Sequence, residues 1–293
     1  MKKNNFSFAF KLAFVIIFVI AIFVTGGVFL DKVVIPKNFS VYGIHNIGEL
    51  TGVFRTLYSS PKKNTYSNIY DEKDNESMAK KLSMAGYSID LDGTIDLQDD
   101  FCGNSKVELN ERELSAVCSR IAESGMMEDD FVYLDYFDTR LIEIVGINIV
   151  ADKNTKDGEA NQYLSADMTV LMKVDTSKLR SQIASNMETT EALLKIIITH
   201  QLFFEINFNV SVSGDDFEIN DVTLLVNGKN NERSERLMNL LIRFIYPEDS
   251  DVTSESFANL LSDFSVETIG KVGDFAFLKT SDEDDNENAI IFN

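Results

Sequence analysis

The stretch FEINFNVSVSGDDFEINDVTLLV, residues 204–226, contains the pattern that decides the fold. From Phe204 to Val212 an apolar side chain occupies every second position, and polar residues stand between them. Such alternation predicts a strand with one buried and one wet face, which is typical of an antiparallel sheet. After a turn the alternation resumes at Phe217, and its phase shifts before Val222. The shift predicts a β-bulge near Asn220.

Further segments on both sides of this stretch complete the secondary structure. Residues 131–150 are rich in β-branched side chains, and residues 164–174 alternate, so both predict strands of the same sheet. Apolar residues three and four positions apart indicate helices at 46–58, 76–84, 110–124, 190–198, 237–245 and 257–264. A last strand is expected at 275–278. The order predicts an α+β fold, with a curved antiparallel sheet packed by helices on one face.

The helix at 110–124 has a clear start signal. Asn110 is a favourable N-cap residue, and Glu113 follows three positions later, as in a capping box. Gly125 marks the end of the helix. We therefore expect Asn110 and Glu113 to satisfy the free backbone groups of the first turn.

The N-terminal region predicts a membrane anchor. Leu12–Leu30, LAFVIIFVIAIFVTGGVFL, contains no charged side chain and is long enough to span a bilayer. Lysines precede it, so the positive-inside rule predicts a plasma membrane protein with a cytoplasmic N-terminus at 1–11 and an extracytoplasmic C-terminal domain. The alternative is a signal peptide cleaved near Thr25. Beyond the anchor, Pro36 suggests an extended stalk over Val33–Phe39.

The rest of the chain is assigned to one exported domain. We expect this α+β domain to cover residues 31–280 and an acidic tail to cover residues 281–293. The final residues, 289–292, are apolar enough to dock on the domain.

The composition excludes several function classes. The 293 residues include 27 basic and 47 acidic side chains, which gives a net charge of −20. Nucleic-acid binding needs a basic face, so no nucleic-acid partner is expected. His45 and His200 are far apart in the sequence, and no metal or other cofactor is expected. Cys102 and Cys118 allow either a disulfide or two unrelated thiols, the second of them a buried helix residue.

One motif points to catalysis. Ser88–Ile95, SIDLDGTI, resembles the first motif of the haloacid dehalogenase superfamily. That resemblance implies a magnesium-dependent phosphohydrolase in which Asp90 is the nucleophile and Asp92 the general acid. The chemistry needs both carboxylates at the end of a buried parallel strand. The residues themselves favour a β-hairpin turning at Asp92–Gly93.

A second resemblance concerns the whole pattern of anchor, strands and helices. The segments Val107–Ile121, Gln162–Leu179 and Leu202–Ile242 are similar in style to membrane-anchored exported proteins of Gram-positive bacteria with tubular lipid-binding-like domains. The resemblance implies an apolar groove that holds a lipid. We therefore expect a non-enzymatic binding or accessory module of the cell envelope, whose partner is an envelope protein or an apolar ligand. The phosphohydrolase is the alternative.

Overall fold

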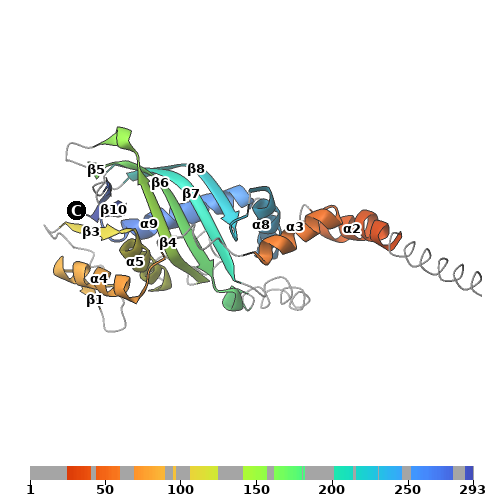
Figure 1. Ribbon diagram of the computed structural model, residues 1–293, viewed down its shortest axis with the longest axis horizontal. Helices are drawn as coiled ribbons and strands as arrows, with labels where there is room; N and C mark the ends of the chain where they lie inside the picture. The colour runs from red at the N-terminus through yellow and green to blue at the C-terminus, as the bar shows by residue number, and fades with distance from the viewer. Residues whose placement is uncertain are drawn as a thin grey trace, which may run out of the picture. The chain divides into compact units, whose positions relative to one another are not determined.

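The computed structural model describes residues 25–40, 44–59, 69–89, 95–96, 106–124, 141–156, 162–179, 181, 201–213, 216–229, 231–245, 252–279 and 288–292. The chain divides into two compact units, Met1–Arg55 and Thr56–Asn293. Each is described by itself below. The elements are labelled in Figure 1.

The first unit is mostly helical in its described residues. Helix η1 is a π-helical turn at Leu30–Val34, α2 covers Ile35–Phe39, and α3 begins at Ile47 and continues to Leu57. The predicted extended stalk is therefore wrong. Pro36 is the second residue after the π-helical turn, and such turns accommodate a proline that would clash with a carbonyl of a regular α-helix.

The predicted membrane anchor lies mostly outside the described residues. Of Leu12–Leu30, only Thr25–Leu30 is described, and it is helical. The part of the chain that the structure describes contains no helix with the length and apolar character needed to cross a membrane. The anchor and the plasma membrane location therefore stay predictions.

The second unit is built on a four-stranded antiparallel sheet in the order β4-β6-β7-β8. Its strands are β4 (Ile142–Ala151), β6 (Ser165–Val174), β7 (Leu202–Ser213) and β8 (Asp216–Val226). Helices α5 (Glu111–Ser124), α8 (Asn231–Ile245) and α9 (Ser254–Gly270) pack against it. In Figure 1, α9 crosses behind the strands. The predicted α+β class and antiparallel sheet are confirmed.

The predicted bulge is confirmed in β8. Asn209 pairs with Asn220, but Asn207 pairs with Thr223, so β8 has one residue more than β7 between these pairs. Asp221 lies inside the bulge and has a φ of 57°. The extra residue explains the phase shift, because a bulge moves the following side chains to the opposite faces.

A second sheet gathers distant segments in the order β3-β10-β9-β5. Its strands are β3 (Val107–Asn110), β10 (Asn288–Phe292), β9 (Phe275–Lys279) and β5 (Gln162–Tyr163). The strand expected at 275–278 is confirmed. Strand β10 pairs with both β3 and β9, so residues 288–292 belong to the fold and not to an acidic tail. The expected docking of the apolar end is thus confirmed.

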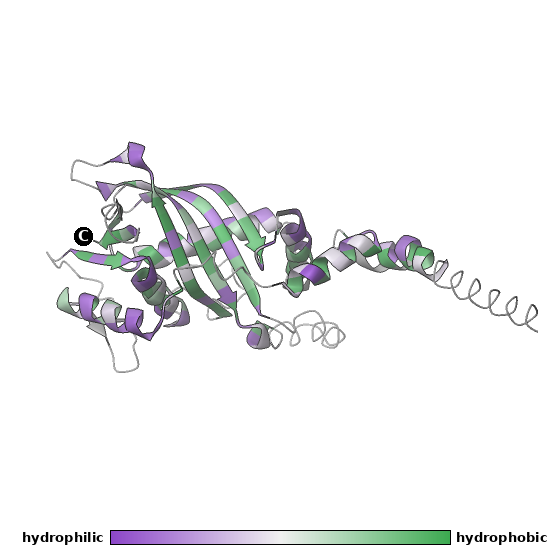
Figure 2. Cartoon of the chain, viewed as in Figure 1, coloured by the Kyte–Doolittle hydropathy of each residue, from purple (hydrophilic) through white to green (hydrophobic). Residues whose placement is uncertain are grey.

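The core lies between the helices and the inner face of the larger sheet. Phe204, Ile206, Phe208 and Val210 alternate with polar residues and are almost completely buried. Figure 2 shows the resulting alternation of apolar and polar residues along the strands. On the outer face, polar side chains form cross-strand pairs, such as the 2.7 Å bond from the Thr169 hydroxyl to the Asn207 carboxamide. These pairs stabilise the wet face of the sheet.

Cys118 is a free thiol in the core. It lies on α5 with no exposed surface, and burial raises its pKa. Of the two alternatives, a disulfide or two unrelated thiols, the second fits Cys118, which is a buried helix residue. Cys102 lies outside the described residues. Because the thiolate is the reactive species, a buried neutral thiol is inert.

Alkylation tests this burial. In a Cys102→Ser chain, we expect iodoacetamide at pH 8 to modify Cys118 only in the unfolded fraction, so its rate follows the urea unfolding curve. A free thiol of the unfolded chain gives the reference rate. Fast modification of the native chain would show that α5 is not packed as described.

Candidate functional site: the open edge of the sheet

The larger sheet has two edge strands, β4 and β8, and side chains cover the first. The β4 amides of Ile147 and Ile149 donate to Ser115 Oγ at 2.8 Å and to Glu111 Oε1 at 2.6 Å. The Asn288 side chain donates to the Ile149 carbonyl at 2.5 Å. An uncovered edge would leave these groups free to pair with another chain. The β4 edge is therefore sealed by its own protein.

The spacing of the two side chains on α5 explains how they seal the edge. Glu111 and Ser115 are four residues apart on one helix face, which corresponds to a rise of about 6 Å. Ile147 and Ile149 are two residues apart on a strand, which corresponds to about 6.6 Å. The two repeats match, so one face of α5 serves two successive outward amides.

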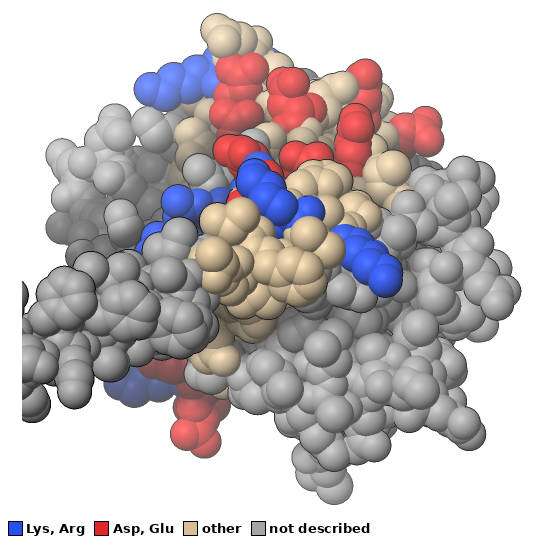
Figure 3. Space-filling view, turned by 90° about the vertical axis from the view of Figure 1, so that its right-hand side faces the viewer, with Lys and Arg blue, Asp and Glu red and all other residues tan. Residues whose placement is uncertain are grey.

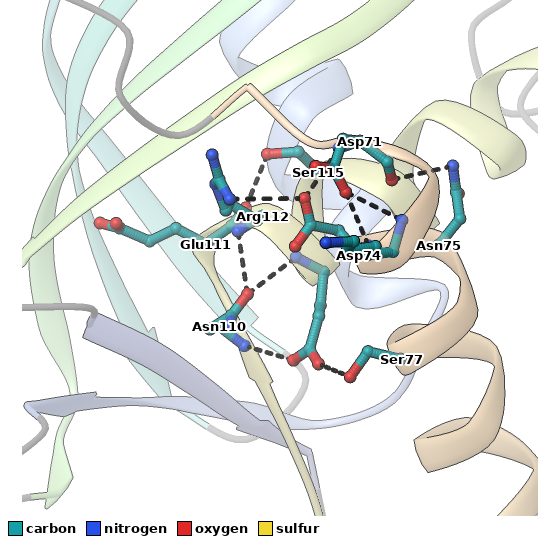
Figure 4. A network of polar contacts seen from close by, with 10 residues as sticks. Asp71, Asp74, Asn75, Ser77, Asn110, Glu111, Arg112 and Ser115 are labelled. Carbon is teal, nitrogen blue, oxygen red and sulfur yellow. Dashed lines mark hydrogen bonds and ion pairs between the residues drawn. The ribbon is translucent and has the colours of Figure 1, made fainter.

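The position of α5 is set by its N-terminus and by α4 (Glu72–Met84). The Asn110 Oδ1 accepts from the Glu113 amide at 2.9 Å, and Glu113 Oε2 accepts from the Asn110 amide at 3.0 Å, so the predicted capping box is confirmed. Glu113 is buried, and it also accepts from Ser77 and Lys81 of α4, each at 2.6 Å. Figure 4 shows this network between α4 and α5. Its groups satisfy one another, which indicates a structural role.

The other edge, β8, differs from β4. The Asn227 amide donates to the Phe203 carbonyl at 2.9 Å, whereas the Val226 amide donates away from β7, to Ser234 Oγ at 2.8 Å. In an antiparallel ladder, inward and outward residues alternate. Leu224 is two residues before Val226, so its N–H and C=O also point away from β7. Ser234 accepts from the amide at the end of the edge, whereas the outward Leu224 amide forms no hydrogen bond with another described residue.

Ser234 is expected to contribute measurably to stability. Its side chain is fully buried, and its removal in Ser234→Ala leaves the Val226 amide without an acceptor. We expect a loss of about 1–2 kcal/mol in the free energy of unfolding, measured with urea. Ser83→Ala, at an exposed serine of α4, is the control. Equal effects of the two changes would contradict the role of Ser234.

A groove opens beside this part of β8. Its volume is about 610 Å³, which is within the usual range of ligand sites. It is lined by Val222, Thr223, Leu224, Glu235, Met238, Asn239, Thr253, Ser254, Glu255 and Ala258, which belong to β8, α8 and the start of α9. The inner-face residues of β8 from Phe217 to Leu224 are only partly buried, unlike their neighbours on β7. The groove thus combines apolar surface with outward backbone groups.

The sequence explains the start of α9 at this groove. Thr253 is the N-cap: its Oγ1 accepts from the Ser256 amide at 3.1 Å, and the Ser256 hydroxyl in turn accepts from the Thr253 amide at 2.8 Å. One turn later, the buried ring of Phe257 lies edge-on to Phe204 of β7, with 6.0 Å between centroids. This contact packs the start of α9 against β7, next to the groove.

A second hollow of about 510 Å³ lies at the end of β4 and β6. Its lining includes the ion pair between Lys173 and Glu143, at 2.5 Å, and Asp175. A hydrogen bond from the Ser177 hydroxyl lowers the pKa of Asp175. Because these charges are used in ion pairs and turns, this hollow indicates no chemistry of its own.

The phosphohydrolase alternative requires a parallel strand at Ser88–Ile95, and the described residues of this motif form none. Asp90 and Asp92 lie outside the described residues. Their flanking strands, β1 (Ser88–Ile89) and β2 (Ile95–Asp96), pair antiparallel, as the predicted hairpin requires. Ile89 pairs with Ile95, so an odd number of residues separates the strands, and the expected two-residue turn at Asp92–Gly93 does not fit this register.

Tyr87, the residue before that motif, contacts a distant segment of the chain. Its hydroxyl donates to the Val272 carbonyl at 2.7 Å. Contact between the segments does not supply the end of a buried parallel strand that the nucleophile needs. Among the described residues, no group of three or more histidine, cysteine, aspartate or glutamate side chains is arranged to hold a metal ion.

Comparison of the chain with protein-family models, with curated proteins and with solved structures gave no match. The candidate site therefore depends on geometry alone. Sequence reasoning identified the strand and the helices that form the groove, but it did not single out Leu224, Ser234 or Glu235. The available signal was the bulge, which marks a place where regular pairing ends.

Proposed function

We propose that this protein is a membrane-anchored, extracytoplasmic binding module of the cell envelope. In this proposal Leu12–Leu30 anchors the chain, and the open β8 edge holds an extended segment of a partner protein. The described end of the anchor supports the first part, because Val28, Phe29 and Leu30 expose about half of their surfaces, from 46% to 58%. Exposed apolar side chains in a row favour a lipid or protein environment.

The observation that supports the binding site most strongly is the difference between the two edges. Side chains of α5 and β10 cover two amides and a carbonyl of β4, whereas Leu224, whose backbone groups point away from β7, lines a groove. Proteins that recognise extended segments use such an edge for main-chain hydrogen bonds and a neighbouring groove for side chains.

An apolar ligand is the second candidate, since Val222, Leu224, Met238 and Ala258 give the groove an apolar part. The remaining lining residues are polar, however, and sites for small molecules are mostly apolar and bury most of the ligand. An extended protein segment, which alternates its side chains, matches a mixed lining better.

Site-specific photo-cross-linking in native membranes tests the proposal. A photoreactive residue at Asn239, in the groove, is compared with one at Glu76, on the exposed face of α4. We expect a protein adduct at position 239 and none at position 76. The adduct should be lost in Leu224→Pro, because this change removes the outward amide. A lipid adduct at 239 would favour the apolar ligand. Identical adducts at both positions would contradict the site.

A further inference from the structure

The charged residues that line the groove are of one sign. Glu235 and Glu255 line it, and no lysine or arginine does among the described residues. Glu218 and Asp221 of β8 are exposed along the same edge. Figure 3 shows acidic side chains gathered on the upper part of the face at the right of Figure 1, with lysine and arginine side chains beside and below them. The nearby Arg236 is paired with Glu232 at 2.7 Å and does not line the groove.

We infer, on the basis of the proposed function, that the segment held at β8 is extended, basic and alternating. It adds antiparallel or parallel to β8 and accepts a hydrogen bond from the Leu224 amide. Its apolar side chains cover Val222, Leu224 and Met238, and its lysine or arginine side chains meet Glu235 and Glu255. Opposite charges on neighbouring strands stabilise such a pair.

The same charges disfavour a second copy of this chain as the occupant. Edge-to-edge pairing of two β8 strands would bring Glu218 and Asp221 of one copy near the acidic residues of the other. Like charges across a strand pair are destabilising, and charged edges with bulges are a common protection against self-association. The acidic edge thus favours a basic partner over a second copy of the chain.

The position of Leu224 allows the backbone contribution to be separated from the side chain. Leu224→Pro removes an N–H that points away from β7, so no bond of the β7–β8 ladder is lost. Leu224→Ala removes the side chain but keeps the N–H. The double change Glu235→Gln with Glu255→Gln removes the two groove charges. Glu72→Gln with Glu76→Gln on α4 changes the net charge equally at exposed positions.

The test uses the full chain in lipid nanodiscs and short peptides with blocked termini. The probes alternate valine with lysine, with serine or with glutamate, and a fourth probe is the lysine peptide with alternate amides N-methylated. Affinity is measured together with hydrogen exchange of the β8 amides. We expect the lysine peptide to bind best, to protect the Leu224 amide, and to bind more weakly in high salt.

The variants give the expected changes. Leu224→Pro is expected to weaken binding by about tenfold relative to Leu224→Ala, which is typical of one lost hydrogen bond. The groove charge variant is expected to weaken it by about fivefold relative to the α4 variant. If Leu224→Pro does not fold, N-methylation of the peptide removes the same pairing from the other side.

Three other outcomes would each contradict a different part of the proposal. If the serine or glutamate peptide protects β8 as well as the lysine peptide, the basic partner is wrong but the proposed function remains. If neither Leu224→Pro nor N-methylation of the peptide changes the affinity, the peptide does not bind by strand addition. If no peptide of any charge protects β8, the proposed function fails with the inference.

Discussion

Phe257→Ala is expected to lower the free energy of unfolding by about 4 kcal/mol, because it removes a large ring from the core. The ring is 1% exposed and lies edge-on to Phe204, so its removal leaves a cavity between α9 and β7. Because Phe257 follows the N-cap of α9 by one turn, the cavity also loosens the wall of the groove. Urea unfolding followed by circular dichroism measures the loss, since the chain has no tryptophan.

Phe257→Leu is the matched control. It keeps most of the apolar volume, and we expect a loss of less than half that of the alanine variant. If Phe257→Ala lost less than about 1 kcal/mol, the ring would not be in the core, and α9 would not hold the groove as described.

Glu111→Ala is expected to lower the free energy of unfolding by about 3 kcal/mol. The carboxylate is 3% exposed, and its Oε1 accepts from the Ile149 amide at 2.6 Å. Hydrogen bonds to charged groups contribute about 1.5–3 kcal/mol, and the buried amide left behind has no water to replace the acceptor. Amide exchange at Ile149 should accelerate in this variant more than exchange at Val170, in the centre of the sheet.

Glu111→Gln separates the acceptor from the charge. The carboxamide oxygen can still accept from Ile149, so we expect a loss of about 1 kcal/mol. Equal losses for alanine and glutamine would mean that the side chain contributes by charge or packing and does not seal the β4 edge.

Much of the fold could be predicted because it depends on local patterns. The alternation at Phe204–Val212 indicated the buried face of β7, and the phase shift indicated the bulge at Asp221. The pair Asn110 and Glu113 indicated the start of α5, since a capping box involves residues only three positions apart. The stalk at Val33–Phe39 was wrong because proline is compatible with a helix where the turn before it is widened.

Other features depend on residues far apart in the sequence. Strand β10 lies between β3 and β9, and it is separated from β3 by most of the chain. No local pattern specifies which strand a short apolar segment will join. Register is another example: Ile89 pairs with Ile95, although the Asp-Gly pair favours a register shifted by one residue.

The candidate site could not be predicted for a related reason. Leu224, Ser234 and Glu235 are ordinary residues of a strand and a helix, and no motif marks them. Whether an edge strand is accessible depends on which distant elements pack against the sheet. Glu111 and Ser115 accept from the β4 amides, whereas the Leu224 amide forms no hydrogen bond with another described residue. This difference can be seen only once all the elements are packed together.

Residue-resolved amide hydrogen exchange of the full chain in lipid nanodiscs tests the open edge most directly. We predict slow exchange at Ile147 and Ile149, although they lie on an edge strand, because side chains of α5 accept from them. We predict fast exchange at Leu224 between slowly exchanging amides of Thr223 and Leu225, which face β7. If the Leu224 amide were protected as well as its two neighbours, the β8 edge would be closed and the proposed binding site contradicted.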